Sequence, residues 1–255
     1  MMAGVAPSVC VAALLCRLLL PAGGPAASGQ AAPEEILDAL FRRLEQRDRH
    51  CRGAVYQADY RYQERNRGGE LLREESCRRR IRLRDEGPEI EFLSVKVNQE
   101  ELAGSDREGQ IAKLLRRGLV QDAARMPFFP GTRDAYEYEL AGEDTHAGRE
   151  VWVVRFAPRS EEAQAVVGRA FVDKESCDLI GLEFSPVHLP RSCVGALMRL
   201  HFATQQGWML PDRLEMDLDI RVKWLVTLAH RRLRIEDRYS DYRFAAGHAR
   251  SPGGR

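Results

Sequence analysis

The six histidines are the side chains best suited to acid–base or metal chemistry, and their spacing matches no catalytic pattern. They are His50, His146, His188, His201, His230 and His248. No HExxH motif, GxSxG turn, glycine-rich phosphate loop or SxxK box occurs in the sequence. We therefore expect a protein that is not an enzyme and that binds no metal or cofactor. A hydrolase with an unrecognised site remains an alternative.

The N-terminus has the pattern of a secretory signal. Residues 9–20 are apolar apart from Arg17, and a segment of small residues, glycine and proline follows up to Ser28. We predict a signal peptide over residues 1–28 and an exported mature protein, with an uncleaved N-terminal anchor as the alternative. No later stretch approaches the roughly 20 apolar residues that span a bilayer.

The predicted export makes disulfide bonds possible between the cysteines outside this segment. They are Cys51, Cys77, Cys177 and Cys193, and no two of them have the short spacing of zinc ligands. An even number in an oxidising compartment favours up to two disulfides. We predict that Cys51 pairs with Cys77 and Cys177 with Cys193. The other pairings and free buried thiols remain open.

The strongest structural pattern lies in residues 213–242. Leu214, Met216, Leu218 and Ile220 occupy every second position, and charged residues fill the positions between them. A strand places such apolar groups on one face and the charges on the other, whereas a helix would scatter them. The pattern predicts long antiparallel strands with one face in water.

Similar alternation recurs along most of the chain, with short turns between the alternating runs. We predict a mainly β (α+β) fold in which about 9–11 strands in consecutive hairpins form a single curved antiparallel sheet. This sheet would make up one domain, residues 34–244, whose interior is either filled, as in a closed small barrel, or open, as in a half-open barrel. Residues 245–255 are rich in Gly, Ala, Pro and Arg and are predicted to be a disordered tail.

Two helical patterns interrupt the strands. The first is an apolar stripe made of Ile36, Leu37, Leu40, Phe41 and Leu44, and the second is made of Ile111, Leu114, Leu115, Leu119 and Val120. We predict that the first helix lies over the mouth or side of the sheet. The second helix and the aromatic loop around Phe128 would form a lid over the interior. Ordinary core packing of the second helix is the alternative.

Charge excludes one class of partner. The sequence has 39 Lys and Arg and 38 Asp and Glu, and Arg17 is the only charged residue of the predicted signal peptide. The mature part is therefore neutral, which gives no support for nucleic-acid binding. Arg78, Arg80, Arg82 and Arg84 share one strand face. They indicate either a basic stripe for anionic lipid heads or an acidic partner, or a solvated face offset by nearby acids.

Four local runs carry a resemblance to a known family. They are REVWVVRFAPR at 149–159, GRAFVDKESCDLIGLEF at 168–184, GWMLPDRLEMDLDIRV at 207–222 and YSDYRF at 239–244. Together with the exported N-terminus, the leading helix and the order of hairpins, they make residues 34–244 similar to the LolA/LolB-like superfamily. This superfamily contains periplasmic outer-membrane lipoprotein-sorting proteins and RseB-type regulators.

The resemblance implies an unclosed barrel whose apolar concave face binds lipoprotein acyl chains or other lipids, with helices as a lid. It implies a carrier, and we expect it to be monomeric and served by an inner-membrane donor complex. An envelope module that binds a membrane regulator is the alternative. We place the ligand contacts at Leu115, Met126, Phe128, Phe129, Trp152, Phe156, Phe202, Trp208 and Met216.

Overall fold

In a computed structural model, the described part of the protein comprises residues 32–84, 87–116, 127–129, 131–160, 165–189, 192–223 and 227–244. The predicted signal peptide and C-terminal tail lie outside these residues and stay predictions. Across the described ranges, no helix has the length and apolar character that a membrane span needs.

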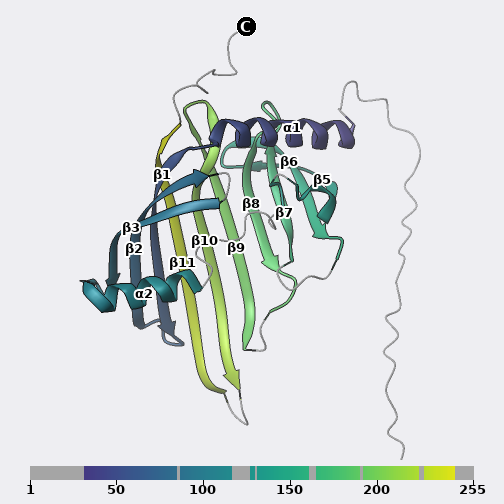
Figure 1. The fold of residues 1–255 in the computed structure, drawn as a ribbon. Coiled ribbons are helices and arrows are strands. Elements are labelled where there is room, and N and C mark those ends of the chain that lie inside the picture. The colour runs from purple at the N-terminus through teal and green to yellow at the C-terminus, as the bar shows by residue number, and fades with distance from the viewer. Residues whose placement is uncertain are drawn as a thin grey trace, which may run out of the picture. The chain divides into compact units, whose positions relative to one another are not determined.

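One antiparallel sheet contains the eleven strands that the described residues form (Figure 1). The strands are β1 (Val55–Asn66), β2 (Leu71–Arg84), β3 (Gly87–Val97), β4 (Glu100–Glu101), β5 (Tyr136–His146), β6 (Arg149–Pro158), β7 (Val166–Asp173), β8 (Leu179–Pro186), β9 (Cys193–Gln205), β10 (Trp208–Lys223) and β11 (Thr227–Arg243). The predicted mainly β class and the single curved sheet are confirmed.

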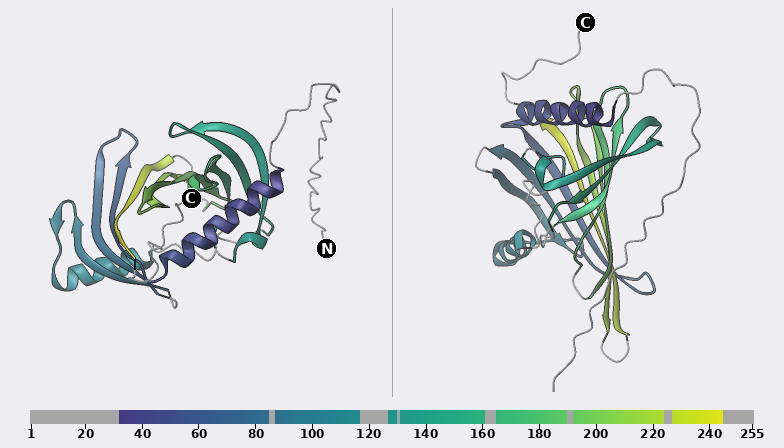
Figure 2. Two further views of the ribbon diagram at one scale, coloured as in Figure 1. Left: turned by 90° about the horizontal axis from the view of Figure 1, so that it is seen from above. Right: turned by 90° about the vertical axis from the view of Figure 1, so that its right-hand side faces the viewer.

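The order of strands across the sheet is β4-β3-β2-β1-β11-β10-β9-β8-β7-β6-β5. Strands that follow one another in the chain pair as hairpins, except that α2 and its flanking segments separate β4 from β5. The first strand and the last strand pair in the middle of the sheet, where Tyr60 lies opposite Asp237. Because β4 and β5 are the edges and do not pair within the described residues, the curved sheet is a half-open barrel, as predicted (Figure 2).

The first helix, α1 (Pro33–Cys51), begins at a proline, which suits the first helical position. The side chain of Glu35 accepts a hydrogen bond from the backbone N–H of Ala32 at 3.2 Å. The predicted apolar stripe is buried at Ile36, Leu40, Phe41 and Leu44. The helix crosses the open side of the curved sheet near one end (Figure 2).

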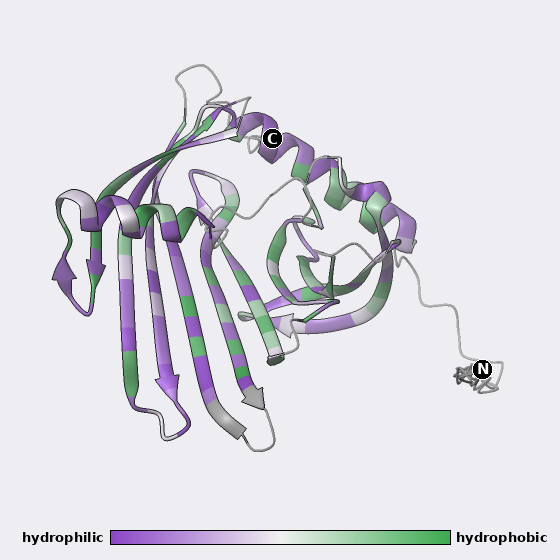
Figure 3. Cartoon of the chain, turned by 60° about the horizontal axis from the view of Figure 1, so that its bottom comes forward, coloured by the Kyte–Doolittle hydropathy of each residue, from purple (hydrophilic) through white to green (hydrophobic). Residues whose placement is uncertain are grey.

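The second helix, α2 (Gly104–Arg116), lies on the sheet near β3 (Figure 1). A short 3-10 turn, η2 (Arg133–Ala135), precedes β5. The structure thus has both predicted helical elements, one before β1 and one inserted between β4 and β5, although Leu119 and Val120 of the second pattern lie outside the described residues. Apolar and polar residues alternate along the strands that the two helices face (Figure 3).

The face of the sheet that α1 and α2 contact is called the concave face below. On β10 it carries Met216 and Leu218, whereas Asp217 between them is exposed on the opposite, convex face. The alternation predicted for residues 213–242 therefore places apolar side chains inward. On β2 the convex face holds ion pairs, from Arg78 to Asp59 at 2.8 Å and from Arg80 to Glu91 at 2.8 Å. The solvated-face interpretation of this arginine row is confirmed.

The structure does not have the two disulfides that we predicted, because Cys51, Cys77, Cys177 and Cys193 are free thiols. Cys177 precedes β8 and Cys193 begins β9, and Gly181 lies opposite His201 in this antiparallel pair. The two cysteines are therefore at opposite ends of the strand pair, on the order of 40 Å apart at about 3.3 Å per residue, whereas a disulfide needs Cα atoms within about 7 Å.

The other predicted pair fails because its members lie in different parts of the core. Cys51, at the end of α1, packs beside Trp208 and Tyr242. Cys77 lies in β2 opposite Tyr60 and belongs to the cluster under α2. The two cysteines are close together in the sequence. However, β1 leads away from Cys51, and Cys77 lies beside Tyr60, partway along that strand.

Candidate functional site

The concave face is filled where α1 covers it. Leu40, Phe41 and Leu44 of α1 pack into a cluster with inward residues of β5 to β9. Examples are Phe156 and Leu182, each about 1% exposed. These described side chains pack together as a protein core does, at the density of a crystal.

Phe128 closes this cluster from the side of the β4–β5 connection. Its side chain is 1% exposed, and its ring centroid lies 5.4 Å from that of Phe156 and 6.1 Å from that of Phe41. A positive φ of 64° turns the backbone at this residue. The turn is held by Thr132, whose Oγ1 donates a hydrogen bond to the carbonyl oxygen of Phe129 at 2.8 Å.

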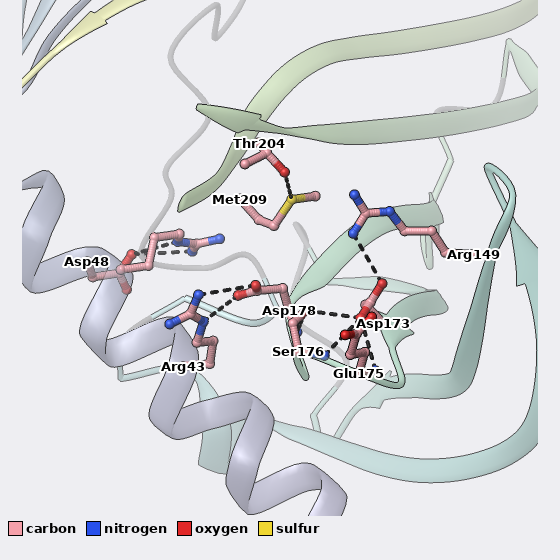
Figure 4. A network of polar contacts seen from close by, with 10 residues as sticks. Arg43, Asp48, Arg149, Asp173, Glu175, Ser176, Asp178, Thr204 and Met209 are labelled. Carbon is pink, nitrogen blue, oxygen red and sulfur yellow. Dashed lines mark hydrogen bonds and ion pairs between the residues drawn. The ribbon is translucent and has the colours of Figure 1, made fainter. Parts of the chain in front are cut away.

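An ion pair fastens α1 to the β7–β8 turn. Arg43 Nε donates a hydrogen bond to Asp178 Oδ1 at 2.7 Å, and its Nη2 reaches Oδ2 at 3.3 Å (Figure 4). The same guanidinium lies 4.8 Å from the ring centroid of Trp208, on β10. Arg43 therefore joins the helix to two parts of the sheet at once.

The turn that receives Arg43 is itself fixed by Asp173. Its Oδ1 accepts hydrogen bonds from the backbone N–H groups of Glu175 and Ser176 at 3.0 and 2.9 Å, and Arg149 donates to Oδ2 at 3.2 Å. Burial raises the pKa of this carboxyl, but the hydrogen bonds to Ser176 and Arg149 outweigh burial and lower it overall. The aspartate is thus held ionised, and α1 docks on a rigid turn (Figure 4).

A second cluster covers the concave face at the other side of the sheet. Leu114 of α2 is 1% exposed and packs against Tyr60, Tyr62 and Cys77. A polar contact accompanies it, because Gln110 of α2 donates a hydrogen bond at 2.8 Å to the buried carboxylate of Glu75. The cluster binds α2 to β1, β2 and β3.

Between the two covered regions, β10 and β11 form a strip of partly exposed apolar side chains. We call it the concave strip, and it consists of Met216, Leu218, Ile220, Leu233 and Ile235. The strands set its geometry, since Met216 lies opposite Ile235, and Leu218 lies opposite Leu233. On the other side of β10, Met216 faces Met198 and Leu218 faces Ala196 of β9. Met216 also packs against the cluster under α1, and Leu233 and Ile235 pack against the cluster under α2. The strip therefore joins the two covered regions and remains partly exposed.

A buried charged pair also lies on the concave face. Arg79 of β2 is 1% exposed and Asp237 of β11 is 4% exposed, and Arg79 Nη2 lies 2.6 and 2.5 Å from the two carboxylate oxygens. The guanidinium lies 5.9 Å from the ring centroid of Tyr60. Within the described residues, Arg79 Nε is buried without a hydrogen-bond partner. The pair connects β2 to β11 across β1.

The structure brings five of the predicted ligand residues into the cluster under α1. Phe128 and Phe156 are fully buried there, and Trp152, Phe202 and Met216 pack against it with partial exposure. Arg47 of α1 lies over Phe202, with its guanidinium carbon 5.8 Å from the ring centroid. Of the five, Met216 alone is also part of the concave strip.

The other predicted residues lie elsewhere. Phe129 is half-buried beside Phe128. Trp208 packs in a separate cluster, with its ring 4.9 Å from that of His50. Leu115 is 47% exposed on α2, and Met126 lies outside the described residues. The predicted set therefore spans several regions of the fold.

The sequence-based set omitted most of the concave strip and the buried ion pair. The alternation had placed Leu218, Ile220, Leu233 and Ile235 on one apolar face, but large aromatic residues were preferred as ligand contacts. Arg79 carried no signal, because it stands between Arg78 and Arg80 in a run that reads as a solvated face. Among the residues that the structure describes, no group of three or more His, Cys, Asp or Glu side chains could hold a metal ion.

No protein-family model and no curated protein matches the sequence. Among solved structures, similar folds occur in a DUF1329 family protein from Desulfovibrio piger, with a TM-score of 0.47 and 14% identity over 84% of this chain and 93% of that one. A putative outer membrane lipoprotein-sorting protein domain from Vibrio parahaemolyticus has a TM-score of 0.40 and 16% identity over 82% and 94%. A LolA superfamily protein from Nitrosomonas europaea has 0.40 and 13% over 85% and 95%.

One of these structures is a member of the superfamily that the sequence resembles, and another is a putative lipoprotein-sorting domain.

Proposed function

We propose that the protein is an exported lipid-binding protein that holds acyl chains on the concave strip and carries lipoproteins or lipids through the periplasm. The observation that carries the proposal is the partial exposure of Met216, Leu218, Ile220, Leu233 and Ile235 on the inner wall of a half-open barrel. Soluble proteins bury such a continuous apolar wall unless it serves binding.

The strip has a length and chemistry that suit an acyl chain. Met216 and Ile220 are four residues apart on one strand, which corresponds to about 13 Å. Each methylene that leaves water for an apolar wall contributes about 0.8 kcal/mol, so half a dozen methylenes contribute about 5 kcal/mol before the cost of association. Binding of this strength is reversible, as a carrier requires.

The two helical covers give the strip its boundaries. On one side lie α1 and Phe128, fastened by Arg43 to the β7–β8 turn, and on the other side lies α2. A longer acyl chain would extend from the strip toward the cluster under α1, where Met216 already packs. We propose that α1 and Phe128 then act as the lid.

Lipid extraction and mass spectrometry of the protein, purified after expression of the full sequence, test the proposal. A fluorescent fatty acid then measures the affinity. We expect Leu218→Gln to weaken binding about tenfold, which is roughly 1.4 kcal/mol. The matched control is Val167→Gln, because Val167 is 43% exposed and lies on the outward position of β7, opposite Ser185. Lipid-free protein without uptake, or equal affinity in both variants, would rule the carrier out.

An alternative proposal is an envelope regulatory module of the same fold. It is supported by β5, which pairs with β6 alone among the described strands and so presents an edge that an extended peptide could join. Its residues from Ala141 to Thr145 are exposed. Protein that lacks lipid but binds an extended peptide with a gain of β signal in circular dichroism would favour this module over the carrier.

A further inference from the structure

Most of the exposed large apolar side chains lie at one end of the sheet. Of the eight such residues in the described part of the chain, five are at the β1–β2 turn or at the β8–β9 connection. We call these five the apolar rim, which consists of Leu71, Leu72, Val187, Leu189 and Val194. Their exposed fractions run from 36% to 49%.

Strand pairing shows that both parts of the rim belong to the same end. Arg65 lies opposite Leu71 in the first hairpin, and Asn66 lies opposite Arg231 of β11. Arg231 in turn faces Ile220 of β10, which faces Cys193, the residue before Val194. This end is the lower one in Figure 1, away from α1.

Arginines without carboxylate partners accompany the rim. Arg65 and Arg232 lie directly opposite each other on β1 and β11, a like-charge pairing that destabilises a sheet. Arg65 donates to the carbonyl oxygen of Gly69 at 2.9 Å, and Arg67 is exposed in the turn. Within the described residues, none of these three arginines forms an ion pair. An anion between them would remove the repulsion.

We propose that this end of the sheet docks on the surface of a bilayer that contains anionic phospholipids. Leucine and valine side chains at separate strand connections form an edge that can enter the headgroup region, and the arginines would meet the lipid phosphates. A protein partner would need a contiguous apolar patch, whereas the rim consists of separate side chains along one end of the sheet. The inference goes beyond the proposed carrier, because docking is independent of a bound acyl chain.

The position of the concave strip adds a geometric argument. Ile220, the outermost member of the strip, is next to the rim, since it lies opposite Cys193. Leu218 and Met216 continue the strip away from the rim along β10. A protein that docked through the rim would thus present the end of its apolar wall to the bilayer.

Vesicle flotation of the full chain tests the docking. The vesicles contain phosphatidylcholine alone or with about one-third phosphatidylglycerol, which gives the negative surface that arginines require. We expect binding to the anionic vesicles. In the double variant Arg65→Gln/Arg232→Gln the partition coefficient should fall about 25-fold, since each arginine contributes roughly a factor of five. Leu71→Ser/Leu72→Ser should reduce binding as well, because the apolar insertion is lost.

Matched controls separate docking at the rim from general effects. Arg80→Gln/Arg84→Gln removes the same charge nearer the other end of β2, where both arginines pair with exposed glutamates. Leu93→Ser removes an exposed leucine of β3, 37% exposed and away from the rim. Both controls should bind anionic vesicles as the unchanged protein does, and all variants should keep fatty-acid uptake from solution. No binding by the unchanged protein, or equal losses in rim and control variants, would overturn the proposal. An acidic protein partner would then be the better explanation of the arginines.

Discussion

The guanidinium of Arg79 and the carboxylate of Asp237 form a buried ion pair, with Nη2–oxygen distances of 2.6 and 2.5 Å. The pair lies inside an apolar face and links β2 to β11, with β1 between them. Breaking such a pair from one side leaves an uncompensated charge in the core, which is far more destabilising than the pair is stabilising.

We expect Arg79→Met to lower the free energy of unfolding by about 3–5 kcal/mol, because Asp237 then stays buried without its counter-charge. Urea denaturation measures this quantity. Arg78→Met is the control, since Arg78 is 57% exposed in its pair with Asp59 and should change the free energy by about 0–1 kcal/mol. Similar losses in the two variants would show that the buried pair has no special role.

The same variant should change the pH dependence of stability. Burial raises the pKa of Asp237, and the charge of Arg79 opposes that shift. Without Arg79 the folded-state pKa rises further above the unfolded-state value of about 3.9. Because protonation then favours the folded state, the deficit in stability should be smallest below that value and grow as pH rises through the folded-state pKa. A deficit that is constant from acid to neutral pH would contradict this explanation.

The contact of Arg43 with Asp178 should control how firmly α1 is held. We expect Arg43→Met to destabilise the protein by about 1–2 kcal/mol, because a charge-assisted bond and a cation–π contact are both lost. Amide hydrogen exchange in α1 should accelerate, and fatty-acid uptake should become faster if α1 is the lid. Arg42→Met is the control, since Arg42 is exposed on the same helix. Unchanged exchange in α1 would show that other contacts hold the helix.

Phe128 and Phe129 should differ sharply although they are adjacent. Phe128 is 1% exposed, and its ring stacks or packs against three other aromatic rings of the core cluster, whereas Phe129 is half-buried. We expect Phe128→Ala to cost about 3–5 kcal/mol and Phe129→Ala less than about 1.5 kcal/mol. Thermal or urea unfolding compares them. Equal costs would mean that the cluster closes without Phe128.

The free thiols lead to a chemical prediction. Burial raises the pKa of Cys51 to about 11 and that of Cys77 to about 12, so both remain protonated and unreactive at neutral pH. Maleimide should therefore label Cys77 in the unfolded protein but hardly at all in the folded protein, in which it is 3% exposed. Cys51, Cys77, Cys177 and Cys193 should all react in denaturant without a reductant, and a reductant should leave the melting temperature unchanged. A fall in melting temperature on reduction would show that the protein does contain disulfides.

The sequence was informative wherever a local period decided the structure. Alternation over residues 213–220 indicated the inward face of β10, and the spacing of Leu40, Phe41 and Leu44 indicated the buried stripe of α1. Both patterns repeat within a few residues, so a short window contains the whole signal. The same alternation indicates one shared apolar interior, whereas the half-open form of the barrel was expected from the resemblance to the LolA/LolB-like superfamily.

What remained hidden depends on residues that are distant in the chain. Arg79 finds its partner 158 residues later, so nothing near it shows that it is buried. The cysteine pairs were chosen by closeness in sequence, whereas strand direction puts Cys177 and Cys193 at opposite ends of a hairpin. The placement of Trp208 outside the main cluster likewise follows from its contact with His50 of α1, which no period predicts.

The pairing of β1 with β11 has a consequence for how the chain is made. Synthesis runs from β1 to β11, so the strand that completes the centre of the sheet is the last to emerge from the ribosome. Until then β1 pairs with β2 alone and β10 pairs with β9 alone, so the edges that β11 later joins have no partner strand. Contacts that span almost the whole chain also form slowly. We infer that the nascent sheet stays incomplete until β11 is synthesised, which would suit the proposed export in an unfolded state.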